Sequence, residues 1–128
     1  MQTRKRMIMM VGTRHDLSRE LAAALGLRPG VDEIKHHGWY NPNAITNAGE
    51  PGGRPDIIVT EARPSGAANT FRIYVRDLAI AHPQAKIVVI APGIGSGRFN
   101  ADAVVHTPAI EDLVEAIRPL LPSETVDA

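Results

Sequence analysis

Three short segments of the chain consist almost entirely of apolar residues, without the alternation of polar and apolar positions that marks a half-buried strand. They are residues 7–11 (Met-Ile-Met-Met-Val), 57–59 (Ile-Ile-Val) and 87–90 (Ile-Val-Val-Ile). Continuous apolar runs of this length are typical of strands covered on both faces, as in a parallel sheet. A shorter run at 103–105 predicts a further strand, and residues 31–37, with one central aliphatic residue, predict a strand at a sheet edge.

Apolar residues at helical spacing fill three of the gaps between these runs, over residues 17–25, 71–78 and 110–117. Side chains that can accept hydrogen bonds from free backbone amides predict where these helices start. The candidates are Thr13 or Asp16 for the first helix, Asn69 or Thr70 for the second, and Thr107, followed by Pro108 at the first helical position, for the third. The predicted helix ends are at Gly26, Pro83 and Pro119.

Strands that alternate with helices predict an α/β three-layer sandwich. We expect a five-stranded parallel sheet in the order 2-1-3-4-5, the flavodoxin-like arrangement. Residues 92–102 contain three glycines where a crossover helix would stand, so the fourth helix is expected to be reduced. A length of 128 residues fits one domain, and residues 1–128 are predicted to form it.

Composition narrows the class of function. The 14 Lys and Arg balance the 14 Asp and Glu, which argues against nucleic-acid binding through bulk charge. Cysteine is absent, which excludes disulfides and thiolate chemistry. No apolar run approaches the ~20 residues of a membrane span, and the short run after the basic start is too brief for a signal peptide. A cytoplasmic protein is expected.

Residues 55–66 (Pro-Asp-Ile-Ile-Val-Thr-Glu-Ala-Arg-Pro-Ser-Gly) resemble the third strand and following loop of response-regulator receiver domains. In that family the strand begins with Pro-Asp and ends on the phosphorylated aspartate. Residues 87–90 match the family's fourth strand, and residues 101–108 match its last strand and Lys-Pro turn. The resemblance covers most of the chain. It implies a CheY-like fold and a role in signal transduction by two-component systems.

The functional positions of the receiver family carry other residues in this chain. The acidic pair that holds Mg²⁺ corresponds to Gly12 and Thr13, and the phospho-acceptor position to Glu61. The phosphoryl-reading hydroxyl, the lysine and the aromatic switch correspond to Ala91, Thr107 and Val104. Aspartyl phosphorylation needs a carboxylate, a metal and a cation together. We therefore interpret the chain as an atypical, phosphorylation-independent pseudo-receiver that is not an enzyme and holds no cofactor or metal.

Glu61 itself is not expected to be phosphorylated. One interpretation is a strand-end acid that pairs with Arg14 or Arg63, and the other is a constitutive mimic of a phosphorylated residue.

Two rival functions use other residues. A glycine-rich loop after the fourth strand could bind a nucleotide or another anion, because glycines let backbone amides approach a phosphate. Its candidate ligands are Gly93, Gly95, Ser96, Gly97 and Arg98. A small enzyme would instead use His15, His106 and Glu61, if these met at the carboxyl ends of the strands.

Protein partners, including a second copy of the chain, are the expected binding partners. Receivers commonly dimerise through the fourth helix, fifth strand and fifth helix, and the residues give a separate reason. If residues 92–102 form mostly loop, apolar surface beside the last two strands loses its cover. The candidate interface residues are Val104, Glu111 and Glu115. The two acids would face Arg98 of a second copy. The competing expectation is that Ile94 and Phe99 fill the gap.

Overall fold

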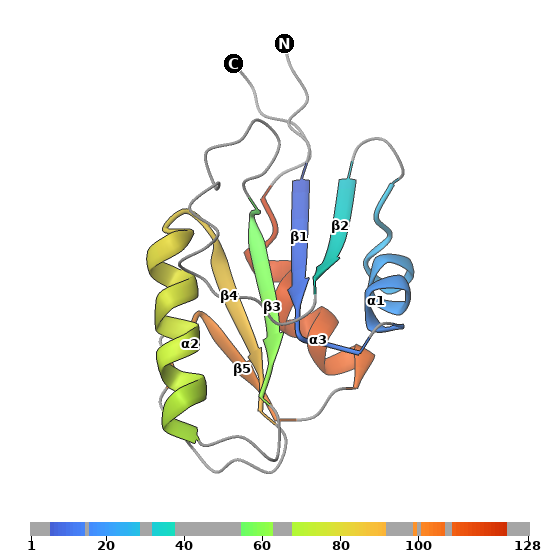
Figure 1. Ribbon diagram of the computed structural model, residues 1–128. Coiled ribbons are helices and arrows are strands. Elements are labelled where there is room, and N and C mark those ends of the chain that lie inside the picture. Colours follow the sequence, from blue (N-terminus) through green and yellow to red (C-terminus); the bar gives the residue numbers. More distant parts are fainter. Residues whose placement is uncertain are drawn as a thin grey trace.

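The computed structural model describes residues 6–14, 16–28, 32–37, 55–62, 68–91, 99, 101–106 and 109–122. They form a five-stranded parallel sheet between two layers of helices (Figure 1). The strands are β1 (Arg6–Val11), β2 (Asp32–His37), β3 (Ile57–Glu61), β4 (Lys86–Ile90) and β5 (Ala103–Val105). The helices are α1 (Leu17–Leu25), α2 (Ala68–Ala81) and α3 (Ile110–Ile117), which continues into a 3₁₀ turn, η3 (Arg118–Leu120). The strand order is β2-β1-β3-β4-β5, as predicted.

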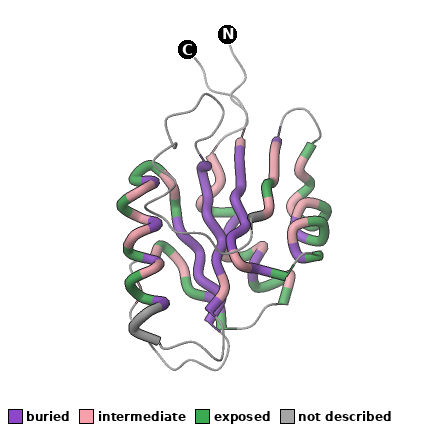
Figure 2. The backbone as a smooth tube through the Cα atoms, viewed as in Figure 1, coloured by how far each residue is buried: buried purple, intermediate pink, exposed green. Residues whose placement is uncertain are grey.

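The two faces of the sheet carry separate apolar cores. Helices α1 and α3 cover one face, where Leu17, Leu21 and Leu113 pack against alternate residues of β1, β3 and β4. Helix α2 covers the other face through Phe71 and Val75. The central strands are buried along nearly their whole length (Figure 2). This explains why their sequences are continuous apolar runs instead of alternating patterns.

The helix ends agree with the sequence prediction better than the helix starts. Gly26 ends α1 with φ +70°, a conformation that glycine adopts without a Cβ penalty. Pro119 lies in η3, where the α-helical hydrogen bonding of α3 has ended. Asp16 is the N-cap of α1, but its side chain makes no capping hydrogen bond. The reason is its helical backbone (φ −75°, ψ −19°), because a capping side chain normally turns back from an extended residue.

The predicted starts of the other two helices were wrong by two or three residues. Helix α2 begins at Ala68, so Asn69 and Thr70 lie inside its first turn and neither is the cap. Helix α3 begins at Ile110 after an extended Ala109 (φ −67°, ψ 136°), so the helix starts beyond Thr107 and Pro108. Its first turn carries Glu111 and Asp112, whose negative charges favour a helix N-terminus without a side-chain cap.

Two aspartates tie the amino ends of neighbouring strands together. The backbone N–H of Asp56 donates to the Met7 carbonyl at 2.8 Å, and the Met7 N–H donates back to the Asp56 carboxylate at 2.9 Å. Asp102 repeats this exchange with Ile87, with both distances at 2.8 Å. The two carboxylates therefore satisfy backbone amides that begin β1 and β4.

A third aspartate holds the sheet edge at β2 through an ion pair. The Arg6 guanidinium donates to both carboxylate oxygens of Asp32, at 2.7 and 3.0 Å. The side chain of Asp32 is 1% exposed and that of Arg6 11%. The hydrogen bonds from Arg6 hold the pKa of the Asp32 carboxyl below its ordinary value. Arg6 also donates to the Pro122 carbonyl at 3.3 Å, which links the two ends of the described chain.

His82 lies immediately after α2 and is fully buried. It continues the inward-facing positions of the helix, which include Phe71, Val75 and Leu78. Neither ring nitrogen of His82 has a hydrogen-bond partner. Burial lowers the pKa of this imidazole, so it is neutral near pH 7.

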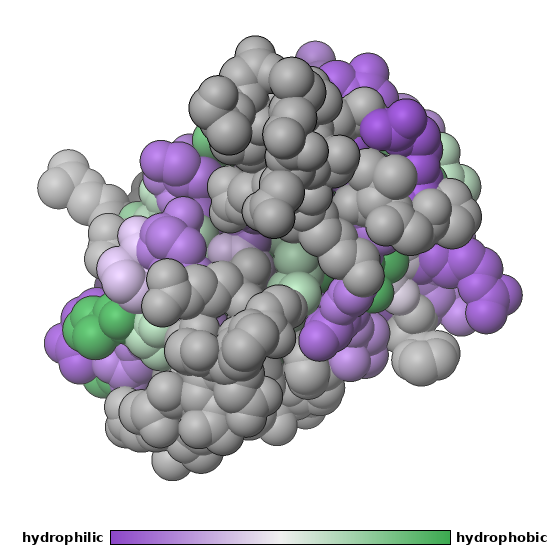
Figure 3. Space-filling view, turned by 90° about the horizontal axis from the view of Figure 1, so that it is seen from above, coloured by the Kyte–Doolittle hydropathy of each residue, from purple (hydrophilic) through white to green (hydrophobic). Residues whose placement is uncertain are grey.

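The hydrophobic side chains that remain exposed include two on the outer side of α2. Ile73 is 50% and Ile80 is 70% exposed. In the view from above, hydrophobic colour appears on the left, the side of α2, and hydrophilic groups cover much of the rest of the described surface (Figure 3). Among the described residues, no helix is long and apolar enough to cross a membrane.

Candidate functional site

The carboxyl ends of the strands meet at one edge of the sheet, where α/β folds of this kind usually hold ligands and reacting groups. The chain leaves β1 through Gly12, whose φ of +67° suits a residue without a Cβ, and then through the buried Thr13. The His36 ring on β2 donates from Nε2 to the Thr13 carbonyl at 3.0 Å. The exit from β1 is therefore fixed to its neighbour β2 by a hydrogen bond from the His36 side chain to a backbone carbonyl.

Glu61 is the last residue of β3 and is half-buried, opposite Ile90 in the ladder. Burial raises the pKa of its carboxyl, and the positive charge of Arg14 partly offsets this effect. The influence of Arg14 agrees with the interpretation of Glu61 as a strand-end acid beside a basic residue. Arg63, the other proposed partner, lies outside the described residues.

Two buried hydroxyl groups and a buried methyl group also lie at this edge. The Oγ1 atoms of Thr13 and Thr60 have no hydrogen-bond partner. Ala91, which follows β4, is fully buried, and its N–H donates to the Val105 carbonyl at 2.8 Å. Ala91 thus offers no hydroxyl at the position where a receiver reads the phosphoryl group.

The donor set at this edge does not fit the Mg²⁺ site that the receiver resemblance would imply. Magnesium prefers one or two carboxylates with octahedral oxygen ligands. In the described part of the chain, no three His, Asp or Glu side chains are grouped so that they could hold a metal ion. Glu61 supplies one carboxylate at this edge, but the β1 exit supplies Gly12 and Thr13 where the resemblance would place an acidic pair.

The residues of the two rival functions are not brought together among the described residues. Loop residues 92–98 and His15 lie outside the described ranges, so both predictions remain untested there. His106 is exposed after β5. Because β4 lies between β3 and β5, the ends of these strands are about 10 Å apart at normal strand spacing. Glu61 and His106 are therefore not direct neighbours in the sheet.

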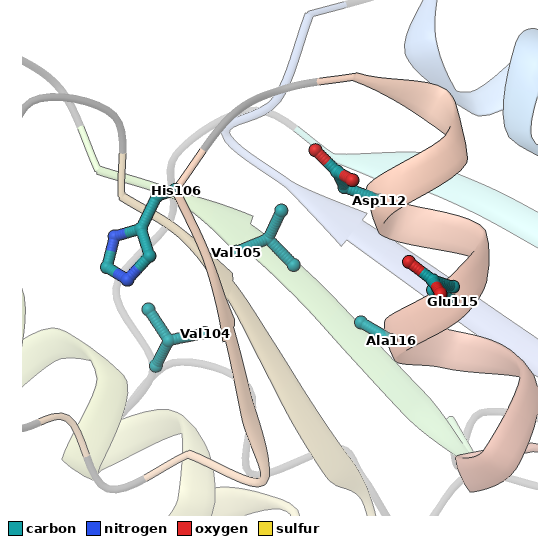
Figure 4. Close-up of a pocket in the computed structure, with 6 residues that line it drawn as sticks. All are labelled: Val104, Val105, His106, Asp112, Glu115 and Ala116. Carbon is teal, nitrogen blue, oxygen red and sulfur yellow. The ribbon is translucent and has the colours of Figure 1, made fainter.

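A second candidate site is a groove between β5 and α3, with a volume of about 520 Å³. Figure 4 shows Val105 pointing from β5 toward α3, while Val104 and His106 lie on the other side of the strand. Ala116 and the carboxylates of Asp112 and Glu115 line the helix side. The groove therefore combines an apolar floor with acidic groups along one wall.

The predicted interface residues lie at or near this groove. Val104 is 36% exposed, and Glu111 and Glu115 are exposed on α3. The competing expectation for the neighbouring surface is partly correct, because Phe99 packs edge to face on Phe71 with ring centroids 5.4 Å apart. Phe99 thus covers the β4 side of this region, and Ile94 lies outside the described residues.

Sequence reasoning missed the groove itself, including the residues Val105, Asp112 and Ala116. Asp112 and Glu115 are three positions apart, so the sequence could place them on one face of a helix. Their position beside β5 depends on how α3 packs on the sheet, which helical spacing alone does not determine.

Comparison with known proteins supports the fold. No protein-family model matches the chain, and no curated protein matches it in sequence. A putative CpaE2 pilus assembly protein from Sinorhizobium meliloti 1021 superposes with a TM-score of 0.61 at 15% identity, over 89% of this chain and 98% of that chain. The structure of the phosphorylated P1 domain of CheA3 in complex with CheY6 from R. sphaeroides gives a TM-score of 0.49 at 19% identity, over 90% and 95%. With the strand order, the first of these likenesses establishes a flavodoxin-like, receiver-like α/β fold.

Proposed function

We propose that this chain is a receiver-like signalling or regulatory domain of the cytoplasm that acts through protein–protein contact, without phosphorylation and without catalysis. The observation that carries the proposal lies at the carboxyl ends of the strands. There, the residues that take part in phosphorylation in receiver domains are replaced by others in this chain. Gly12 and Thr13 follow β1, and the buried methyl group of Ala91 follows β4. The receiver-like fold supports the class of function, and these residues support independence from phosphorylation.

Phosphoryl transfer to a carboxylate needs the negative oxygens of the incoming group to be neutralised. Among the described residues, Glu61 is the acid that ends β3, and its half-buried side chain has a raised pKa. Arg14 supplies one positive charge nearby, and no group of three or more His, Asp or Glu side chains that could hold a metal ion occurs among the described residues. A role as a nucleophile is therefore unfavourable for Glu61.

Incubation with acetyl phosphate and Mg²⁺ is expected to leave the protein unmodified. The physical reason is that the described residues hold no group of three or more His, Asp or Glu side chains able to bind a metal ion. Intact-protein mass spectrometry measures the result, with a phosphorylatable receiver domain treated in parallel as the positive control. A mass increase of one phosphoryl group that disappears in the Glu61→Gln variant would contradict the proposed function.

A homodimer through the β5 and α3 side is the form of contact that we propose first. Val104 supplies exposed apolar surface, and Glu111 and Glu115 supply charges that Arg98 of a second copy can meet. The similar fold of a putative pilus assembly protein agrees with a role in contact between proteins. Nucleotide or anion binding by loop 92–98 stays a prediction from the sequence.

The Val104→Asp substitution is expected to convert this dimer to a monomer without unfolding the chain. Burying an unpaired carboxylate in an interface costs several kcal/mol, whereas Val104 is 36% exposed in the single copy. Sedimentation velocity at micromolar concentration measures the change. Ile80→Asp on α2 is the matched control, because Ile80 is 70% exposed and lies on another element. A wild-type chain that sediments as a monomer throughout would show the dimer proposal to be wrong.

A further inference from the structure

The strand β5 forms one edge of the sheet and offers backbone groups for pairing. In the part of the chain that the structure describes, no strand lies beyond β5. The Val105 carbonyl accepts a hydrogen bond from Ala91, next to β4. Because the N–H and C=O of successive strand residues alternate in direction, those of Val104 point away from β4. An extended segment could pair with both groups, as unpaired edge strands allow.

The side chains around this edge differ on the two faces of the sheet. On the α3 side lie Asp112 and Glu115, beside the apolar surface of Val105 and Ala116 (Figure 4). On the opposite side lie the exposed side chains of Val104, which is apolar, and His106. Among the described residues, the lining of the groove contains two carboxylates and no lysine or arginine.

We propose that the groove between β5 and α3 binds an extended segment of a partner protein in which basic and aliphatic residues alternate. The segment adds to β5 as a sixth strand through the N–H and C=O of Val104. This inference rests on the proposed function, because it specifies the partner of a domain that acts by contact.

The alternation follows from strand geometry. Successive side chains of the added strand point to opposite faces of the sheet. Those on the α3 side meet Asp112 and Glu115, so lysine or arginine is favoured there, with its methylene stem on Val105 and Ala116. Those on the opposite side meet Val104, so aliphatic residues are favoured. Main-chain bonds then supply affinity and the alternating side chains supply specificity.

Charge also distinguishes this partner from a second copy of the chain. A second copy carries the same two groove acids, and the basic residue proposed to face the acids in a homodimer, Arg98, supplies one positive charge. A segment with two basic residues two positions apart matches both carboxylates. The proposal therefore assigns the groove to a separate protein, which competes with a second copy of the chain for the β5 and α3 side.

The test is a titration with a fluorescein-labelled nine-residue peptide that alternates arginine or lysine with valine. The control peptide has the same composition, with its basic residues and valines in two blocks. Fluorescence anisotropy at low salt is expected to show at least tenfold tighter binding of the alternating peptide, and this binding weakens as salt is added. The double variant Asp112→Asn, Glu115→Gln is expected to weaken binding about tenfold, since each exposed pair contributes up to ~1 kcal/mol. Glu20→Gln removes an exposed acid on α1, which does not line the groove, and is expected to change the affinity less than twofold.

Amide hydrogen exchange tests strand addition directly. Binding of the alternating peptide is expected to slow exchange at Val104 at least tenfold and to leave the amide of Ile80, on the far helix, unchanged. Equal affinity for both peptides, an unaffected double variant, or unchanged exchange at Val104 would each overturn the inference. If the peptide fails while the chain dimerises and stays unphosphorylated, the inference is wrong and the proposed function stands. If Glu61 is phosphorylated, the proposed function is wrong whatever the peptide does.

Discussion

Replacing Arg6 with leucine is expected to lower the free energy of unfolding by about 3 kcal/mol at pH 7. The Asp32 side chain is 1% exposed, so loss of the two guanidinium hydrogen bonds at 2.7 and 3.0 Å leaves a buried carboxylate without its compensating charge. Urea denaturation followed by circular dichroism measures the difference. Arg118→Leu is the control, because the Arg118 guanidinium is exposed and its contact with the Ala24 carbonyl is 3.4 Å long. That variant should stay within about 0.5 kcal/mol of wild type.

The effect of Arg6→Leu is expected to depend on pH. Arg6 depresses the pKa of Asp32 in the folded protein, so the ion pair stabilises the fold fully above the unfolded pKa of about 3.9. This stabilisation is lost as pH falls through the lower pKa of the folded state. The difference between wild type and Arg6→Leu should therefore shrink in acid. A difference that stays constant from pH 7 to pH 3 would contradict the assignment of the effect to this ion pair.

Replacing His82 with leucine is expected to stabilise the protein, by about 1 kcal/mol at pH 8 and by more in acid. At pH 8 the gain comes from removing two buried ring nitrogens that have no hydrogen-bond partner. Below pH 6.5 the unfolded chain binds a proton at His82 before the folded protein does, because burial lowers the pKa of the folded imidazole. Wild-type stability then falls by up to ~1.4 kcal/mol per pH unit from this group, and the variant lacks that loss.

Urea denaturation at pH 8, 6 and 5 measures the gap, which is the difference in free energy of unfolding between His82→Leu and wild type. His106→Gln serves as the control, because it removes a histidine from an exposed position and should change the free energy of unfolding at pH 8 by less than about 0.5 kcal/mol. A gap that does not widen between pH 8 and pH 5 would show that His82 takes up its proton in the folded protein as readily as in the unfolded chain.

The strands of this fold could be predicted because burial on both faces leaves a direct record in the sequence. Residues 7–11 and 87–90 have no polar position, and this pattern has few interpretations other than a central parallel strand. The helix starts are set by backbone geometry at one or two residues. Asp16 has a capping side chain but a helical backbone, and Ala109 has the extended backbone without a capping side chain. Residue type alone therefore predicted these boundaries poorly.

The candidate site was predictable to the extent that it follows from strand ends. Glu61 and Ala91 could be placed at the carboxyl edge from the apolar runs that precede them. The helical spacing of Phe71, Val75 and Leu78 places position 82 on the same buried stripe. Histidine is a polar residue, however, and polar residues are more common at the surface. The groove depends on how α3 lies against β5, a long-range arrangement that a helical pattern does not contain.

The exchange of hydrogen bonds at Asp56 and Asp102 has a consequence for the alignment of the sheet. A parallel strand that slips by two residues along its neighbour keeps every side chain on its own face, so apolar burial alone distinguishes the two alignments weakly. The carboxylate of Asp56 reaches the amide of Met7, and that of Asp102 reaches the amide of Ile87, in one alignment only. A slipped pairing would leave these amides and carboxylates unpaired, at a buried position for Asp56 and a partly buried one for the Ile87 amide. The two aspartates therefore select the native register of the strands among registers that bury similar amounts of apolar surface.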